Sequence, residues 1–190
     1  MYKAKGIIST GFFRTGSTFF FSCLRQVEDL MCFYEPYHPE LLSYVEAERM
    51  GIHKADKNSL GHTLEGGYFE EYTQLDFEEF SKVLCNQNRA TNHPVLIECS
   101  SAIALQQYIG FLISGAESCR RVPVLQANRF NLAIPWIKSR FPDYLTVLIT
   151  RDPWKIFCSL KKLAMYEGRK FDYTLKHDNF WNVSEFFWNI

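Results

Sequence analysis

Short apolar runs alternate with longer amphipathic segments along this chain. The apolar, β-branched runs predict strands at residues 6–10, 31–34, 95–98, 122–127 and 145–150. The segments between them predict helices at residues 17–29, 76–88, 100–114, 132–140 and 153–166. Because strands and helices alternate, we expect an α/β fold with a central parallel sheet and helices on both faces, a three-layer sandwich.

Length and charge limit the classes of protein that this chain can belong to. A chain of 190 residues suits a single domain, 1–190, with one sizeable core. Twenty-one basic and 21 acidic residues give zero net charge, which argues against a nucleic-acid partner. No run of 18 apolar residues and no signal peptide is present, so we expect no membrane segment and a cytoplasmic location.

Residues 11–18 combine a glycine spacing with several donors for an anion. Gly11 and Gly16 are separated by four residues, as in the P-loop of NTPases, but Ser17 stands where that motif has lysine. Arg14 is the one cation of the loop. A strand that leads through such a turn into a helix directs backbone N–H groups at an anion, so we expect phosphate, sulfate or phosphosulfate here. A glycine turn before an ordinary capped helix is the alternative.

A second segment places another cation at a strand end. The buried strand at 145–150 runs into Arg151, followed by Asp152 as a helix cap and Pro153 as the first helical residue. Ser159 follows on the new helix, eight residues after Arg151. Ligands of open α/β sheets bind at the carboxyl ends of the strands. Arg151 is therefore expected at the ligand edge, although a surface arginine remains the alternative.

The two motifs together resemble those of sulfotransferases, in the form seen in carbohydrate and bacterial members. Residues 13–18 resemble their 5′-phosphosulfate loop, and residues 149–153 with Ser159 resemble their 3′-phosphate site. The resemblance covers about residues 5–35 and 122–163. It implies a P-loop NTPase-like fold and 3′-phosphoadenosine-5′-phosphosulfate as the sulfuryl donor, with no metal. It also implies a donor site made of Arg14, Thr15, Gly16, Ser17, Thr18, Arg151 and Ser159.

The resemblance also implies roles in catalysis. Arg14 would stabilise charge on the transferring group. Glu35, which ends an apolar run before Pro36, is the best candidate for the general base of a carbohydrate or small-molecule hydroxyl, with His38 second. A surface ion pair is the other interpretation of Glu35. Residues 37–75 have no clear repeat and are expected to be an insertion over the ligand edge that sets acceptor specificity.

The chain departs from the family pattern at two places. Gln126 and Asn128 stand in the region where cytosolic members carry a lysine and a histidine base, which favours Glu35 as the base; Asn128 or Arg129 could touch sulfate or acceptor. A later glycine- and lysine-containing loop has no match before the apolar end at 186–190, so we expect the C-terminal part of the fold to be missing.

These departures leave other functions open. A scaffold that kept the fold without the chemistry is the first alternative, and a P-loop kinase is the second. A shortened form of a Golgi-type enzyme is an alternative to a cytoplasmic one. The acceptor and the oligomeric state cannot be predicted from the sequence.

Overall fold

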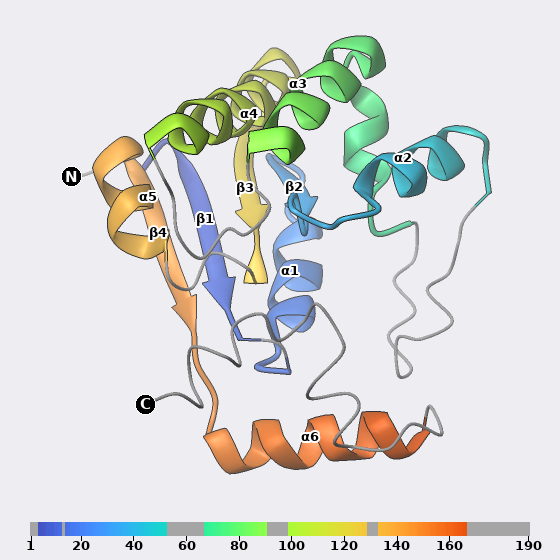
Figure 1. Cartoon of the computed structure of the whole chain (residues 1–190), viewed down its shortest axis with the longest axis vertical. Coiled ribbons are helices and arrows are strands. Elements are labelled where there is room, and N and C mark those ends of the chain that lie inside the picture. The colour runs from blue at the N-terminus through green and yellow to red at the C-terminus, as the bar shows by residue number, and fades with distance from the viewer. Residues whose placement is uncertain (1–3, 13, 53–66, 91–98, 129–132, 167–190) are drawn as a thin grey trace.

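The computed structural model describes residues 4–12, 14–52, 67–90, 99–128 and 133–166 (Figure 1). The predicted strand at 95–98, Arg129 and the segment after residue 166 lie outside the described residues. The described elements form one sheet with helices packed on both of its faces. The fold class predicted from the alternating pattern is therefore confirmed.

Four parallel strands form the sheet in the described part of the chain. They are β1 (Gly6–Gly11), β2 (Leu30–Tyr34), β3 (Val122–Gln126) and β4 (Tyr144–Ile149). Their order is β2-β3-β1-β4, and every adjacent pair is parallel. Each of the four strands begins and ends within one residue of its prediction. Because all pairs are parallel, the carboxyl ends of the strands meet at one edge.

Alternate residues of the sheet face two different helix layers. Ile8 and Leu125 lie in one core with α3 (Phe77–Ala90) and α4 (Cys99–Ser118). Val124 lies on the other face, in a second core with Phe21 of α1 (Ser17–Arg25). This alternation follows from the two-residue period of a strand, and it fixes the three layers.

Two helices flank β4 in the chain. Helix α5 (Ile134–Arg140) precedes the strand, and α6 (Pro153–Tyr166) follows it. Asp152 caps α6, since its Oδ1 accepts hydrogen bonds from Trp154 N (2.8 Å) and Lys155 N (3.1 Å). The predicted bounds of α6 are confirmed. Figure 1 shows α6 at the end of the molecule opposite α3 and α4.

The polar segment at 37–75 contains two elements that the sequence analysis does not predict. They are α2 (Leu41–Arg49) and the 3₁₀ helix η1 (Glu70–Gln74). Leu41 and Tyr72 are buried in the main core, so the described parts of this segment help to build the domain. Three of the nine residues of α2 and two of the five of η1 are charged, and these charges interrupt the apolar positions, which is why the hydrophobic pattern does not reveal the two elements.

The two-sided sheet leads to a prediction about stability. Leu125→Ala empties a site that is 0% exposed and should lower the free energy of unfolding by about 2–5 kcal/mol. Leu148→Ala on β4 is the matched control, since Leu148 is 49% exposed and its loss should change stability by about 0.5 kcal/mol or less. Urea denaturation followed by circular dichroism measures both. Equal losses would contradict the assignment of the core.

Candidate active site

The loop after β1 is braced by its own side chains. Thr15 Oγ1 donates a 2.7 Å hydrogen bond to Phe12 O, and Thr15 N donates to the same oxygen at 3.3 Å. Arg14 (φ 67°) and Gly16 (φ 102°) adopt left-handed backbone conformations. Helix α1 then begins at Ser17 without a side-chain cap, so its first N–H groups point toward the loop.

The space above the loop is suited to an anion. A Cβ atom built on Gly16 would meet no heavy atom within 4 Å. The positive end of the α1 dipole lies beside this open space and favours negative charge. The position after Gly16 is occupied by Ser17, which is buried, so the loop carries no lysine of the NTPase kind.

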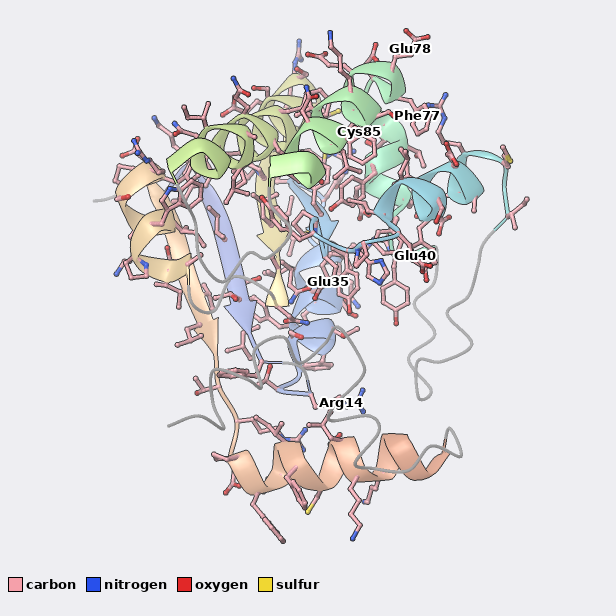
Figure 2. The ribbon with its side chains drawn as sticks, viewed as in Figure 1. Arg14, Glu35, Glu40, Phe77, Glu78 and Cys85 are labelled. Atoms are coloured by element: carbon pink, nitrogen blue, oxygen red, sulfur yellow. The ribbon has the colours of Figure 1, made fainter. Side chains whose placement is uncertain are left out.

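The two predicted motifs meet in space although they are far apart in the sequence. Arg14 Nε donates a 3.0 Å hydrogen bond to Ser159 Oγ on α6. Arg151 Nη1 donates a 3.0 Å hydrogen bond to the backbone oxygen of Arg14. Figure 2 shows Arg14 between the sheet and α6. The prediction that residues 151 and 159 belong to the same site as the loop is therefore supported by direct contacts.

This contact brings two cations together. Burial, and then the positive charge of Arg151, lower the pKa of Arg14. An anion held between the two guanidinium groups would relieve their repulsion and would receive charge-assisted hydrogen bonds from both. The chain thus has a local cationic site although its net charge is zero.

Thr18 and Tyr34 join the loop to the end of β2. Thr18 Oγ1 and the Tyr34 hydroxyl lie 3.0 Å apart and share a hydrogen bond. The backbone oxygen of Tyr34 in turn accepts a 3.1 Å bond from the Tyr72 hydroxyl. The sequence analysis does not single out Tyr34. The only signal for it is its place directly before Glu35.

Glu35 is buried at the carboxyl edge of the sheet. The residue is 3% exposed, so the surface ion pair considered above is wrong. Its backbone N–H donates to Gln126 O at 2.8 Å, and its Oε1 accepts a hydrogen bond from Asn128 N at 3.3 Å. The Gln126 side chain donates from Nε2 to Asn128 Oδ1 at 2.7 Å. Glu35 also has a left-handed backbone, with φ 42°.

His38 lies one turn further along, toward α2. Its backbone N–H donates to Glu35 O at 2.8 Å, and its Nδ1 accepts a hydrogen bond from Glu40 N at 3.2 Å. Its ring centroid lies 5.1 Å from that of Tyr44 and 6.1 Å from that of Phe69. His38 is therefore adjacent to Glu35, but its ring packs among aromatic side chains.

An aromatic group surrounds this corner of the site. Tyr34 and Tyr68 have ring centroids 5.0 Å apart, and Tyr44 stacks on Phe69 at the same distance. All but Phe69 are only partly buried. The sequence predicts aromatic content but not this grouping, because the pairs join separate elements.

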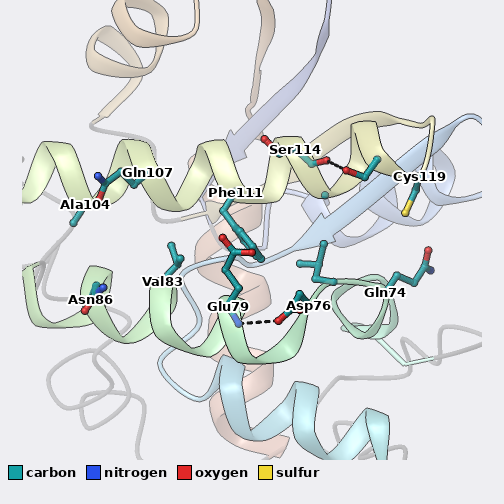
Figure 3. A pocket seen from close by; sticks show the side chains of 13 residues that line it. Gln74, Asp76, Glu79, Val83, Asn86, Ala104, Gln107, Phe111, Ser114 and Cys119 are labelled. Carbon is teal, nitrogen blue, oxygen red and sulfur yellow. Dashed lines mark hydrogen bonds between the residues drawn. The ribbon is translucent and has the colours of Figure 1, made fainter.

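A cavity of about 590 Å³ lies elsewhere, between α3 and α4 (Figure 3). Its charged lining residues are Asp76 and Glu79, both acidic, and Asp76 Oδ1 accepts the N–H of Glu79 as a helix cap. Such a lining does not favour an anion, so this cavity is not a second candidate for the active site.

Searches for other kinds of site found none among the described residues. No group of three His, Cys, Asp or Glu side chains there is placed to hold a metal ion. No helix in the same ranges is both long enough and apolar enough to cross a membrane.

The packing at Gly11 leads to a prediction about the loop. A Cβ at Gly11 would lie 2.7 Å from Ile149 O and 3.0 Å from Thr15 Oγ1, so Gly11→Ala should lower the free energy of unfolding by about 1–3 kcal/mol. Gly110→Ala is the control, since its Cβ meets nothing within 4 Å and alanine favours a helix by up to about 1 kcal/mol. Urea denaturation should give opposite signs for the two variants.

Comparison with known proteins gives one positive result. A family model described as the Sulfotransferase family matches residues 6–185, nearly the whole chain. Neither the curated proteins nor the solved structures contain a match to this chain. The matched range includes the loop at 11–18, Glu35, Arg151 and Ser159. Together with the parallel sheet and the cationic site at its edge, this match establishes that the chain belongs to the sulfotransferase family.

Proposed function

We propose that this protein transfers a sulfuryl group from 3′-phosphoadenosine-5′-phosphosulfate to a hydroxyl of a carbohydrate or small-molecule acceptor. The observation that carries the proposal is the 3.0 Å contact between Arg14 of the first motif and Ser159 of the second. This contact joins the two proposed anion-binding segments into one site, although Arg14 and Ser159 lie 145 residues apart in the sequence. A donor with phosphate groups at both ends of a nucleoside needs such a pair of anion sites.

The donor site is assigned from the loop outward. The backbone of Thr15 and Gly16 with the hydroxyl groups of Ser17 and Thr18 would hold the 5′ phosphosulfate at the start of α1. Arg151 and Ser159 would hold the 3′-phosphate at the start of α6. The open space at Gly16 supports this fit.

Two cations can balance the charge of the donor. Arg14 lies between the two phosphate positions because its Nε contacts Ser159 while its backbone belongs to the loop. A guanidinium offers several N–H donors in a planar fork, so Arg14 can stabilise charge on the leaving phosphate. The donor supplies an activated sulfur–oxygen bond, which breaks as the acceptor oxygen bonds to sulfur.

Glu35 is the proposed general base and takes the proton of the acceptor hydroxyl. The hydrogen bond from Asn128 N, just after β3, fixes the carboxylate at the carboxyl edge, near the loop that Tyr34 contacts through Thr18. Fixing a base in one orientation is what proton transfer in the transition state requires. His38 is the second candidate, since it is adjacent to Glu35.

The acceptor is proposed to lie against the three tyrosines of the aromatic group, Tyr34, Tyr44 and Tyr68, together with His38. These rings are partly exposed and lie on the β2 side of the site. Aromatic faces stack against sugar and phenol rings, and tyrosine hydroxyls add hydrogen bonds. This arrangement supports a ring-containing acceptor.

The donor assignment predicts that donor binding depends on Arg151, at the carboxyl end of β4, and not on Arg140, before its amino end. Arg151→Ala should weaken binding of 3′-phosphoadenosine-5′-phosphate by about 10–100-fold, the loss expected for hydrogen bonds to a charged group. Arg140→Ala is the matched control, because this exposed arginine ends α5 on the amino side of β4. Isothermal titration calorimetry measures both. No binding by the unaltered chain would reject the proposed donor.

The assignment of the base predicts a loss of turnover without a loss of binding. Glu35→Gln should lower kcat by about 10²–10⁴-fold while the affinity for the bisphosphate stays within about threefold. Glu46→Gln, on the exposed face of α2, is the control. Sulfate transfer from radiolabelled donor to a panel of sugars and phenols provides the assay. If Glu35→Gln retains kcat and His38→Gln loses it, the base is His38. Bisphosphate binding without turnover on any acceptor would favour a non-catalytic protein.

A further inference from the structure

Two side-chain amides are buried side by side where β3 ends. Gln126 is 0% exposed and Asn128 is 4% exposed, and their 2.7 Å hydrogen bond lies in the interior. The second polar atom of the Gln126 side chain, Oε1, is buried without a hydrogen-bond partner in the described part of the chain. Burying an unpaired amide oxygen is destabilising because the oxygen loses its hydrogen bonds to water and gains none. An apolar residue at position 126 would avoid this cost, so the amide pair has a role other than stability.

The amide pair and Glu35 hold one another. Glu35 N donates to Gln126 O, and Asn128 N donates to Glu35 Oε1. Backbone groups at the end of β3 and just after it therefore fix both the backbone and the carboxylate of Glu35. Glu35 needs this support because its left-handed φ of 42° is an unfavourable backbone conformation for a residue with a side chain. The bond between the two side chains limits the movement of Asn128, and with it the N–H that meets the carboxylate.

We propose that Asn128 is a positioning residue for Glu35 and that Gln126 acts by fixing Asn128. The inference rests on the proposed role of Glu35 as the base. Both residues supply neutral hydrogen-bonding groups. A cation at either position would form an ion pair with Glu35, lower the pKa of its carboxyl group and weaken it as a base. Neutral amides hold the carboxylate in place without the lowering of its pKa that a cation would cause.

The titration of Glu35 can be distinguished from that of other ionisable groups near it. The pKa of Tyr72, on η1, lies well above its ordinary value because of burial first and of nearby groups including Glu35, so Tyr72 stays neutral while Glu35 titrates. His38 adjoins Glu35 through the backbone and has its own ring signals in NMR spectra.

The test is an NMR titration of the Glu35 carboxyl carbon, assigned with Glu35→Gln, in the unaltered protein and in four variants. Asn128→Ala removes the acceptor of the amide bond, and Gln126→Leu removes its donor together with the unpaired oxygen. Each should raise the pKa of Glu35 by about one unit, because the bond from Asn128 N to the carboxylate is loosened. The double variant should give the same shift as either single variant, because the two residues act through one another. Gln107→Leu, an exposed amide on α4, should give no shift.

Measurements of turnover distinguish a positioning role of Asn128 and Gln126 from a merely structural one. The acid limb of the kcat profile should move up by about one pH unit in both single variants, and kcat near neutral pH should fall about tenfold. KM and bisphosphate affinity should stay within about threefold. Gln126→Leu should fold, since it removes an unsatisfied buried atom along with the bond. Unchanged Glu35 titration in folded variants, or additive shifts in the double variant, would overturn the proposal. Because the titration needs no donor, failure of bisphosphate binding would reject the proposed function alone.

Discussion

The parallel pairing of β1 with β4 is the constraint on which the site depends. Gly11 lies opposite Ile149 in the register, so the two strands end together and their next residues enter the same space. The loop at 11–18 follows one strand and Arg151 follows the other, and the contacts from Arg14 to Ser159 and from Arg151 to Arg14 are the result. The absence of a side chain at Gly11 lets this edge close, since a Cβ there would collide with the backbone of β4.

The elements of this core could be predicted because their sequences carry local signals. The runs that form β2, β3 and β4 are mostly apolar, and Asp152 with Pro153 marks the start of α6. The expectation that the strand at 145–150 is buried is wrong, because β4 lies at the edge of the described sheet and its residues are partly buried or exposed. Helix α1 ends at Arg25, four residues before its predicted end, because no glycine or proline marks that end in the sequence. The 3₁₀ helix η1 is held by a contact between distant segments, from Arg25 Nε to Glu71 Oε1 (2.6 Å), which no local pattern indicates.

Several residues of the candidate site could be predicted from the sequence, but the contacts around Glu35 could not. Residues 14, 151 and 159 were found from short motifs, and their placement at one edge follows from parallel strands. The environment of Glu35 could not be found in this way. Its partners Gln126 and Asn128 lie more than 90 residues away, and no local pattern indicates that the backbone N–H of Asn128 meets a carboxylate. Such contacts depend on the register of β2 against β3, where Tyr34 lies opposite Gln126.

The strand order also separates the two halves of the proposed reaction. Arg151 follows β4 at one side of the sheet, and Glu35 follows β2 at the other, three strand spacings or about 14 Å away. The loop at 11–18 follows β1 between them. An acceptor held beside Glu35 would therefore approach from the β2 side while the leaving bisphosphate is held on the β4 side. Sulfuryl transfer, like phosphoryl transfer, is expected to need the attacking and leaving oxygens in line. The order β2-β3-β1-β4 places the loop after β1 between the ends of β2 and β4, and this supports a carboxylate fixed at the end of β2 as the proposed base in preference to a group on β4.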